Sequence, residues 1–236
     1  MPSPTWAWRH PMSAHFTLAP DLAGIVQPAV LWLTDAAVAE RDPRMDGPIA
    51  ESAAGVRSHP PEEATSVRSM YKQVGLDPTK TRPSSEALLR RVRRGEPLPR
   101  VNVMVDVCNW CSLEFQLPYG LYDADSIRGH VVLRIGMAGE SYPGIRKDEV
   151  RVAGRIALVD EQGPFGNPTS DSARTMVTTA TTRALLVVFA PVDVTQARLA
   201  QVLDTTSRRM TTFTSCREIS RAFPGDPAGA VTSVPG

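Results

Sequence analysis

Residues 101–123, VNVMVDVCNWCSLEFQLPYGLYD, carry more information about the fold than any other stretch of the chain. Valine stands at every odd position from Val101 to Val107, and this alternation predicts a β-strand with one buried face. Further strands, separated by glycine turns, are predicted at 131–135, 150–152, 155–159 and 185–190. The chain is therefore expected to have a β-rich core.

The remaining segments predict helices, short strands and loops around that core. Apolar stretches within residues 16–38, interrupted by proline and glycine, predict two short strands, whereas 41–61 reads as a loop with a weak helix. Apolar residues at helical spacing predict helices over 62–74 and 84–94. A last helix is predicted with Asp193 as its N-cap.

Length and composition favour one folded domain. The chain has 236 residues, 26 basic and 25 acidic side chains and a formal charge of +1, which excludes a protein that coats nucleic acid by bulk charge. We expect a single domain over 16–222, with flexible tails at 1–15 and 223–236. Without a signal-like N-terminus or an apolar run of membrane-spanning length, the expected location is the cytoplasm and no membrane partner is predicted.

Cys108 and Cys111 have the spacing of a redox pair or of half a zinc site. Only Cys216 remains to complete a cysteine set, and the histidines are scattered along the chain. We therefore interpret the cysteines as small buried apolar residues and expect neither a metal nor another cofactor.

The predicted helix after Ser84 carries a group of arginines. Guanidinium groups make bidentate contacts with phosphate, so this helix could contact an RNA backbone. The alternative is that the arginines form the solvated face of an amphipathic helix. The residues concerned are Arg90, Arg91, Arg93 and Arg94.

Residues 163–175 are rich in glycine and small polar side chains that can bind oxyanions. Here Asp171, Ser172 and Arg174 could hold an amino group, a hydroxyl group and a carboxylate or phosphate, respectively. The alternative is a long turn with side-chain caps that leads into a strand. None of the common nucleophile, phosphate-loop or dinucleotide motifs is present in the sequence.

A series of short motifs gives the chain a family resemblance. In order they are Tyr71-Lys-x-x-Gly75-x-Asp-Pro78, Arg82-Pro-Ser-Ser-Glu86-Ala-Leu-Leu-x-Arg91, Val103-x-Val-Asp106-x-x-Asn109-x-x-Ser112-Leu113, Leu117-Pro-Tyr-Gly-Leu-Tyr-Asp123, Ile127-Arg-Gly129, Leu133-Arg134, Gly139-Glu140 and Asp160. In order and spacing, the region 66–191 resembles the B3/B4 domain of the bacterial phenylalanyl-tRNA synthetase β subunit, in its free-standing form.

The resemblance implies both a fold and an activity. The fold would be α+β, a three-layer α/β domain with a β-sandwich core of unusual topology and flanking helices. In the synthetase, the domain hydrolyses tRNA-Phe mischarged with tyrosine, in a pocket between the B3 and B4 portions. The synthetase's remaining domains are missing from this chain, so no aminoacylation site is expected.

Some family residues carry over onto this sequence and others do not. The family's Thr-Asn pair falls on Cys108 and Asn109, so the asparagine is kept and the hydroxyl group is lost. Proline of the Pro-x-His motif falls on Pro118, but the histidine position is Gly120. The missing histidine would have helped to orient water or to recognise the tyrosine hydroxyl.

Two further family features depart from the pattern. A pocket glutamate falls on Val187, and a Gly-Gly turn falls on Asp171 and Ser172. The synthetase's specificity for tyrosine is therefore not transferred to this chain. By the resemblance, a hydroxyl of the terminal ribose could assist hydrolysis while polar residues of the pocket hold the ester and amino groups.

Three functions follow from the resemblance. The first is a stand-alone aminoacyl-tRNA deacylase that acts in trans on the tRNA acceptor end; the others are a non-catalytic RNA-binding adaptor and a pocket recruited to amino-acid-like small molecules. The predicted catalytic residues are Asn109, Asp171 and Ser172. The predicted substrate-binding residues are Cys108, Pro118, Gly120, Arg174 and Thr175.

Overall fold

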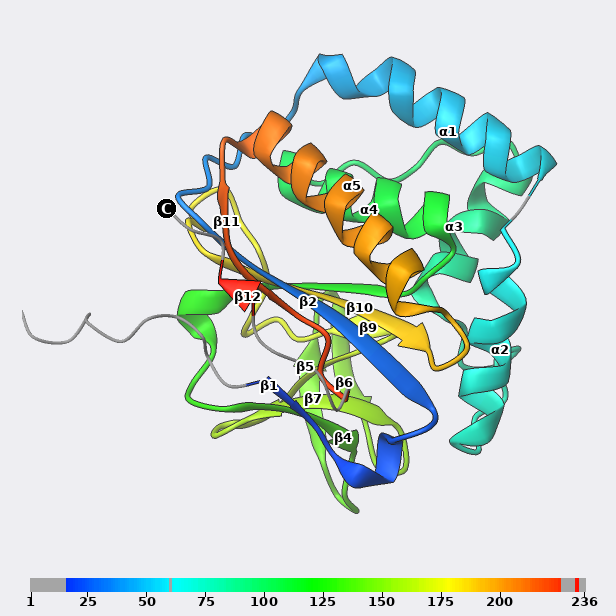
Figure 1. The fold of residues 1–236 in the computed structure, drawn as a ribbon, viewed down its shortest axis with the longest axis vertical. Helices are drawn as coiled ribbons and strands as arrows, with labels where there is room; N and C mark the ends of the chain where they lie inside the picture. The colour runs from blue at the N-terminus through cyan, green and yellow to red at the C-terminus, as the bar shows by residue number, and fades with distance from the viewer. Residues whose placement is uncertain (1–15, 60, 226–231, 234–236) are drawn as a thin grey trace, which may run out of the picture.

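The computed structural model describes residues 16–59, 61–225 and 232–233, and it has an α+β fold (Figure 1). Its α-helices are α1 (Asp46–Ser58), α2 (Glu63–Gln73), α3 (Ser84–Arg93), α4 (Val103–Phe115) and α5 (Gln196–Thr214). Its strands are β1 (Phe16–Leu18), β2 (Val26–Thr34), β3 (Tyr119–Asp123), β4 (Val131–Ile135), β5 (Ser141–Gly144), β6 (Lys147–Arg151), β7 (Ile156–Asp160), β8 (Gly163–Asn167), β9 (Ser170–Asp171), β10 (Ala184–Pro191), β11 (Arg217–Ala222) and β12 (Thr232–Ser233). Short 3₁₀ turns lie at Pro20–Leu22, Pro43–Met45 and Ala124–Ser126.

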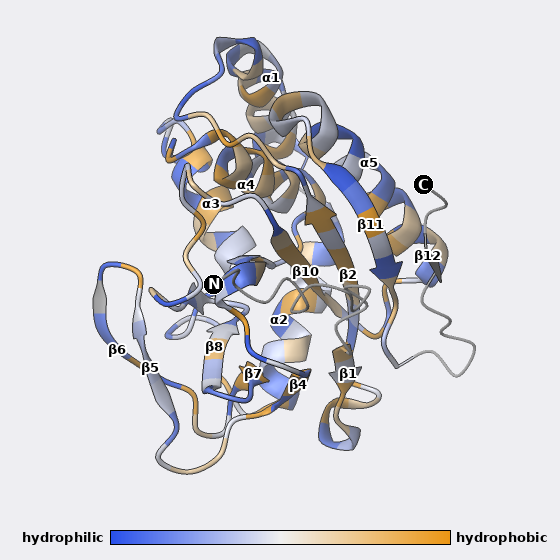
Figure 2. Cartoon of the chain, turned by 90° about the vertical axis from the view of Figure 1, so that its left-hand side faces the viewer, coloured by the Kyte–Doolittle hydropathy of each residue, from blue (hydrophilic) through white to orange (hydrophobic). Residues whose placement is uncertain are grey.

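Two five-stranded sheets form the centre of the molecule. The first, which we call the central sheet, has the order β12-β11-β2-β10-β3 and is antiparallel throughout. Every residue of β10 is buried, and β2 and β10 are coloured as hydrophobic along most of their length in Figure 2. Burial on both faces explains why these strands read as continuous apolar runs.

The second sheet, which we call the outer sheet, has the order β1-β4-β7-β8-β9. The β1 and β4 strands are parallel, and the other neighbours are antiparallel. It packs against the central sheet, where Tyr122 of β3 meets Phe165 of β8 edge to face, with ring centroids 5.1 Å apart. The hairpin β5–β6 stands beside it as a separate ribbon.

Helices α4 and α5 pack together over the central sheet, and α1 lies outside α4 (Figure 1). Together the helices and the two sheets confirm the predicted α+β class with flanking helices. Within the described residues, no helix combines the length and the apolar character needed to cross a bilayer.

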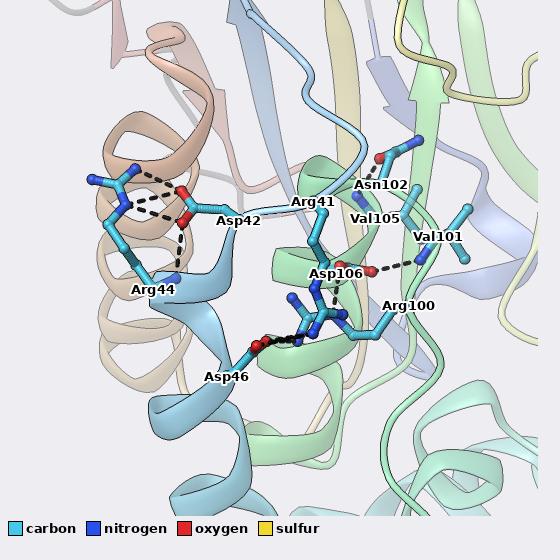
Figure 3. Close-up of polar contacts among 9 residues, drawn as sticks. All are labelled: Arg41, Asp42, Arg44, Asp46, Arg100, Val101, Asn102, Val105 and Asp106. Carbon is cyan, nitrogen blue, oxygen red and sulfur yellow. Dashed lines mark hydrogen bonds and ion pairs between the residues drawn. The ribbon is translucent and has the colours of Figure 1, made fainter.

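The predicted strand at 101–107 is wrong, because residues 103–107 form the start of helix α4. Asn102 caps the helix by accepting a hydrogen bond from the Val105 backbone N–H at 3.0 Å (Figure 3). Ten of the thirteen α4 residues are buried. A helix that is mostly buried has no continuous polar face, so its alternating valines imitate those of a strand.

The first turn of α4 is also held by a buried ion pair. The Asp106 carboxylate, which is fully buried, accepts hydrogen bonds from Arg100 Nε at 2.6 Å and from the Val101 backbone N–H at 2.8 Å. Arg100 Nη1 donates to Asp46 of α1 at 2.9 Å, and Arg41 pairs with the same carboxylate (Figure 3). These contacts fasten α1 to α4 and favour the helix over the expected strand.

Two smaller expectations change as well. The region 41–61 contains the regular helix α1 instead of mainly loop, because Ile49 and Val56 bury one side of it. Thr195, and not Asp193, caps α5, since its hydroxyl accepts from the Arg198 backbone N–H at 3.2 Å. Asp193 instead accepts a hydrogen bond from Ser66 at 2.7 Å.

Most other predicted elements are confirmed. The helices over 62–74 and 84–94 correspond to α2 and α3, and the two early strands to β1 and β2. The strand predictions at 131–135, 150–152, 155–159 and 185–190 correspond to β4, β6, β7 and β10. The expected tail 1–15 lies outside the described residues, whereas part of the C-terminal segment, β12, pairs with β11.

Candidate functional site

Three of the predicted site residues lie close together where α4, β3 and β9 meet. Cys108 comes from α4, Gly120 from β3 and Asp171 from β9, and β3 contacts both of the other elements. Burial raises the pKa of the Cys108 thiol well above its usual range, and the nearby Asp171 carboxylate raises this pKa further. We call Cys108, Gly120, Tyr122, Gly166 and Asp171 the inter-sheet cluster.

Tyr122 fills the middle of the inter-sheet cluster, although its place in the sequence does not predict a role in the site. Its side chain is fully buried and lies between two glycines of facing strands, Gly120 and Gly166. A Cβ atom on Gly120 would lie 2.1 Å from the Tyr122 hydroxyl oxygen, and one on Gly166 would lie 2.3 Å from it. Both positions therefore require glycine while the tyrosine ring occupies this space.

The electrostatics of the cluster keep the phenol and the thiol protonated at neutral pH. Burial raises the pKa of Tyr122 well above its usual range, and Asp171, beside its hydroxyl group, adds to the shift. A protonated phenol or thiol can donate a hydrogen bond, but neither is an activated nucleophile. The thiol and the phenol of the cluster are thus not suited to covalent catalysis.

The two positions at which the family's histidine and glutamate are absent are direct neighbours. Gly120 on β3 pairs with Val187 on β10 in the antiparallel register. Val187 is fully buried, and the ring of Tyr122 crosses Gly120. A tyrosine ring and an apolar side chain therefore stand where the resemblance placed two polar groups.

Other predicted residues around the cluster make contacts within the fold. Ser172 is buried, and its hydroxyl accepts a hydrogen bond from the Arg174 backbone N–H at 3.1 Å. The carbonyl of buried Pro118 accepts from the Phe189 N–H at 2.9 Å, and the carbonyl of Thr175 accepts from Asp123 at 2.9 Å. Ser172 and Thr175 thus lie close to the cluster, in the segment that follows β9.

Asn109 follows Cys108 on α4 and is half-buried. Its side-chain amide makes no hydrogen bond with any residue that the structure describes. An amide with free donors and an acceptor is available to a ligand. The role of Asn109 in catalysis stays a prediction.

Arg174 is held by the protein itself. Its guanidinium group forms two hydrogen bonds of 2.9 Å with the Asp160 carboxylate, which is fully buried. It also donates to the Ser126 carbonyl at 2.8 Å and lies over the Phe165 ring, 5.6 Å from its centroid. The guanidinium therefore supports the wall of the cluster, and its binding to a substrate stays a prediction.

The four predicted RNA-binding arginines on α3 differ in their surroundings. Arg91 and Arg94 both pair with Glu96, at 3.2 and 2.7 Å. Arg90 and Arg93 are exposed and make no ion pair within the described part of the chain. Two positive charges thus remain available at the C-terminal end of this helix.

Helix α3 also connects this basic end with the cluster. The Ser84 N–H at its start donates to the Pro168 carbonyl at 3.1 Å, in the turn just before β9. At a rise of about 1.5 Å per residue, Arg90 and Arg93 lie roughly 9 and 14 Å along the helix from that turn. The start of α3 is therefore held against the turn that leads into β9 and Asp171.

All three cysteines lie in the interior of the described structure. Cys108, Cys111 and Cys216 are buried as free thiols, as expected for small apolar residues. Burial raises the pKa of Cys111, which accepts a hydrogen bond from Arg209 at 3.4 Å. Among the described residues, no three His, Cys, Asp or Glu side chains are grouped so as to hold a metal ion.

Comparison with known proteins assigns the fold. The sequence model of the B3/4 domain matches residues 66–219, which extends the expected region 66–191 through α5 and into β11. An N-terminal fragment of the phenylalanyl-tRNA synthetase beta-subunit from Pyrococcus horikoshii is similar in structure, with a TM-score of 0.52 and 11% identity over 93% of this chain. The chain spans 54% of that fragment. No curated protein matches it in sequence.

Proposed function

The chain belongs to the B3/4 domain family, and from this premise we propose that it hydrolyses the ester bond of a mischarged aminoacyl-tRNA. The observation that supports this most is the link between the inter-sheet cluster and a basic surface. Helix α3 begins against the turn that precedes Asp171 and ends with Arg90 and Arg93 exposed. A tRNA end that contacts the arginines would have its terminal ribose within reach of Asp171.

The reaction requires water to attack the ester carbonyl carbon. The bond between this carbon and the ribose oxygen breaks, this oxygen takes up a proton to become a hydroxyl group, and free amino acid and tRNA are released. The Asp171 carboxylate can accept a hydrogen bond from the substrate's ammonium group or from the attacking water. The Ser172 hydroxyl and the Asn109 amide can orient the ester, and the neighbouring ribose hydroxyl can assist proton transfer.

The basic end of α3 would supply binding and not chemistry. Arg90 and Arg93 can contact phosphate oxygens of the acceptor stem, and such contacts position a nucleic acid without reading its sequence. The balanced total charge of the chain requires that this attraction be local.

The test is a deacylation assay on the purified protein with a panel of tRNAs that carry wrong amino acids. We expect faster release of at least one amino acid than in buffer, and loss of that acceleration in Asp171→Asn. The control is Asp148→Asn, which removes an exposed carboxylate from the neighbouring hairpin strand β6. Thermal unfolding of both variants separates lost chemistry from lost folding.

A second candidate function is a non-catalytic tRNA-binding adaptor. It is favoured by Tyr122, which fills the space of the inter-sheet cluster, and by the apolar Val187 beside Gly120. In that case the protein would bind tRNA without accelerating the loss of any ester. If the protein neither accelerates the loss of any ester nor binds tRNA at low salt, both functions are contradicted.

A further inference from the structure

Tyr122 occupies a space that has the shape of an aromatic side chain. Its ring lies between the backbones of Gly120 and Gly166, and Phe165 closes one side by meeting the ring edge to face at an interplanar angle of 90°. Both glycines lack the Cβ atom that would narrow this space. We call the space bounded by Gly120, Gly166 and Phe165 the tyrosine slot.

The hydroxyl group of Tyr122 is buried without a satisfactory hydrogen-bond partner in the described part of the chain. It lies beside Asp171 but makes no hydrogen bond of normal geometry with the described residues. A buried hydroxyl group without a hydrogen bond destabilises a protein, and phenylalanine would fill the same space without this cost. The tyrosine is therefore not explained by the packing of the core alone.

The slot also lies beside the predicted site residues. Asp171 interacts with both the Tyr122 hydroxyl and the Cys108 thiol, so the far end of the tyrosine ring points toward the carboxylate on which the proposed function depends. A substrate whose ammonium group is held at Asp171 would extend its side chain toward this slot. The protein's own ring already fills it.

We propose that Tyr122 determines which substrates the site accepts, because its ring fills the slot and restricts the aminoacyl group to a small side chain. The inference rests on the proposed deacylase function. It assigns the substrate class as tRNA esters of small amino acids, such as alanine, serine or glycine. Aromatic aminoacyl groups are excluded by overlap with Tyr122.

The first experiment examines the slot without reference to catalysis. Tyr122→Ala opens a cavity that matches p-cresol, the free form of the tyrosine side chain, and cavities opened by truncation bind ligands of matching shape. Added p-cresol should raise the thermal unfolding temperature of this variant. It should leave the wild type and Tyr122→Phe, whose slots stay filled, unchanged.

The second experiment measures selectivity in deacylation. Wild type should hydrolyse alanyl-tRNA in preference to tyrosyl-tRNA, and Tyr122→Ala should shift the ratio of the two kcat/KM values toward tyrosyl-tRNA by at least about tenfold. The matched control is Tyr119→Ala on the same strand. Tyr119 is also buried, but its hydroxyl bonds with Thr206 of α5, on the helix side of the central sheet, at 3.0 Å.

The outcomes distinguish the slot from the function. Hydrolysis by both proteins with unchanged selectivity in Tyr122→Ala overturns the role of Tyr122 alone. A rise in unfolding temperature with p-cresol but no hydrolysis by either protein overturns the deacylase function, and the substrate assignment with it. An equal shift in Tyr119→Ala overturns the assignment, because general loosening would then explain the change.

If Tyr122→Ala fails to fold, Tyr122→Leu provides the same test of selectivity. Leucine retains apolar contact with Phe165 and empties only the far end of the slot. We expect this variant to gain activity on valyl- or leucyl-tRNA relative to alanyl-tRNA. A folded Tyr122→Leu variant with the selectivity of the wild type overturns the proposal.

Discussion

The inter-sheet cluster and helix α3 use arginine in opposite ways. Beside the cluster, Arg174 holds a fully buried Asp160 carboxylate by two hydrogen bonds and lies against Phe165. At the end of α3, Arg90 and Arg93 are exposed and form no ion pair within the described residues. The first arginine therefore contributes to the fold, and the other two remain available to a partner.

This difference shows what determines the role of an arginine. Residue type and neighbouring sequence suggested an anion-binding role for both groups, yet only burial and long-range partners separate them. Asp160 lies on β7, fourteen positions before Arg174 in the chain. A charge with a buried partner is costly to remove, whereas an exposed charge contributes little to stability.

The largest expected effect is a difference in the free energy of unfolding when arginine is replaced by glutamine beside the cluster and on α3. Arg174→Gln leaves the buried Asp160 carboxylate without its main partner and should lower the free energy of unfolding by about 3 kcal/mol. Arg90→Gln should change it by less than about 0.5 kcal/mol, because the side chain is exposed. Urea unfolding of both variants gives the two values.

Equal stability losses in the two variants would contradict the comparison. So would a small loss in Arg174→Gln together with reduced deacylation, since that result would make Arg174 a ligand-binding residue. Asp160→Asn provides the complementary check, because it keeps the shape of the pair and removes the negative charge.

Smaller effects, of opposite sign to each other, are expected at a glycine of the inter-sheet cluster and at a glycine of helix α1. Gly120→Ala should destabilise the fold by roughly 1–3 kcal/mol, because the new methyl group overlaps Tyr122, whose ring cannot move away without meeting Gly166. Gly55 lies in α1 with open space around its Cα, so Gly55→Ala should stabilise by about 0.5–1 kcal/mol.

The double variant Gly120→Ala with Tyr122→Ala tests the cause of this destabilisation. Without the tyrosine ring, the methyl group at position 120 has space, so its cost should disappear. A cost that persists in the double variant would show that the backbone at Gly120, and not Tyr122, requires glycine.

The fold could be predicted from the sequence wherever an element has one buried and one exposed side. Helix α3 shows this well, since Leu89 and Val92 are buried while Arg90 and Arg93 are exposed. Helix α4 could not be predicted in this way, because it packs against α1, α3, α5 and β3 and most of its residues are buried. Its alternating valines therefore predict a strand.

The candidate site could be predicted only in part for a related reason. Asp171 and Ser172 stood out because a polar, glycine-rich loop is visible in the sequence. Tyr122 did not stand out, since its significance depends on Gly166, which lies 44 positions further along the chain on the other sheet. Glycines at positions 120 and 166 leave room for a neighbouring side chain. Only the packing of the two sheets shows that this side chain is Tyr122 in both cases.

The smallest expected effect concerns tRNA binding by α3. Replacing Arg90 and Arg93 together by Gln should weaken tRNA affinity about tenfold and reduce the slope of log K against log salt by roughly 1.4–1.8, the value for two phosphate contacts. Replacing Arg91 and Arg94 instead removes the same amount of charge. Because both of these arginines pair with Glu96, they are less available to phosphate, and their replacement should change the slope less. Fluorescence titration of labelled tRNA over a range of salt concentrations measures both slopes.

The two double variants have equal net charge, so any difference between their salt-dependence slopes reflects the positions of the arginines and not the total charge. A smaller reduction for the Arg91 and Arg94 pair would place the phosphate contacts at the exposed arginines. Identical reductions would mean that tRNA responds only to the overall charge of α3. An unchanged slope in both would show that the arginines form a solvated face, and the basic surface of the proposed function would then have to be abandoned.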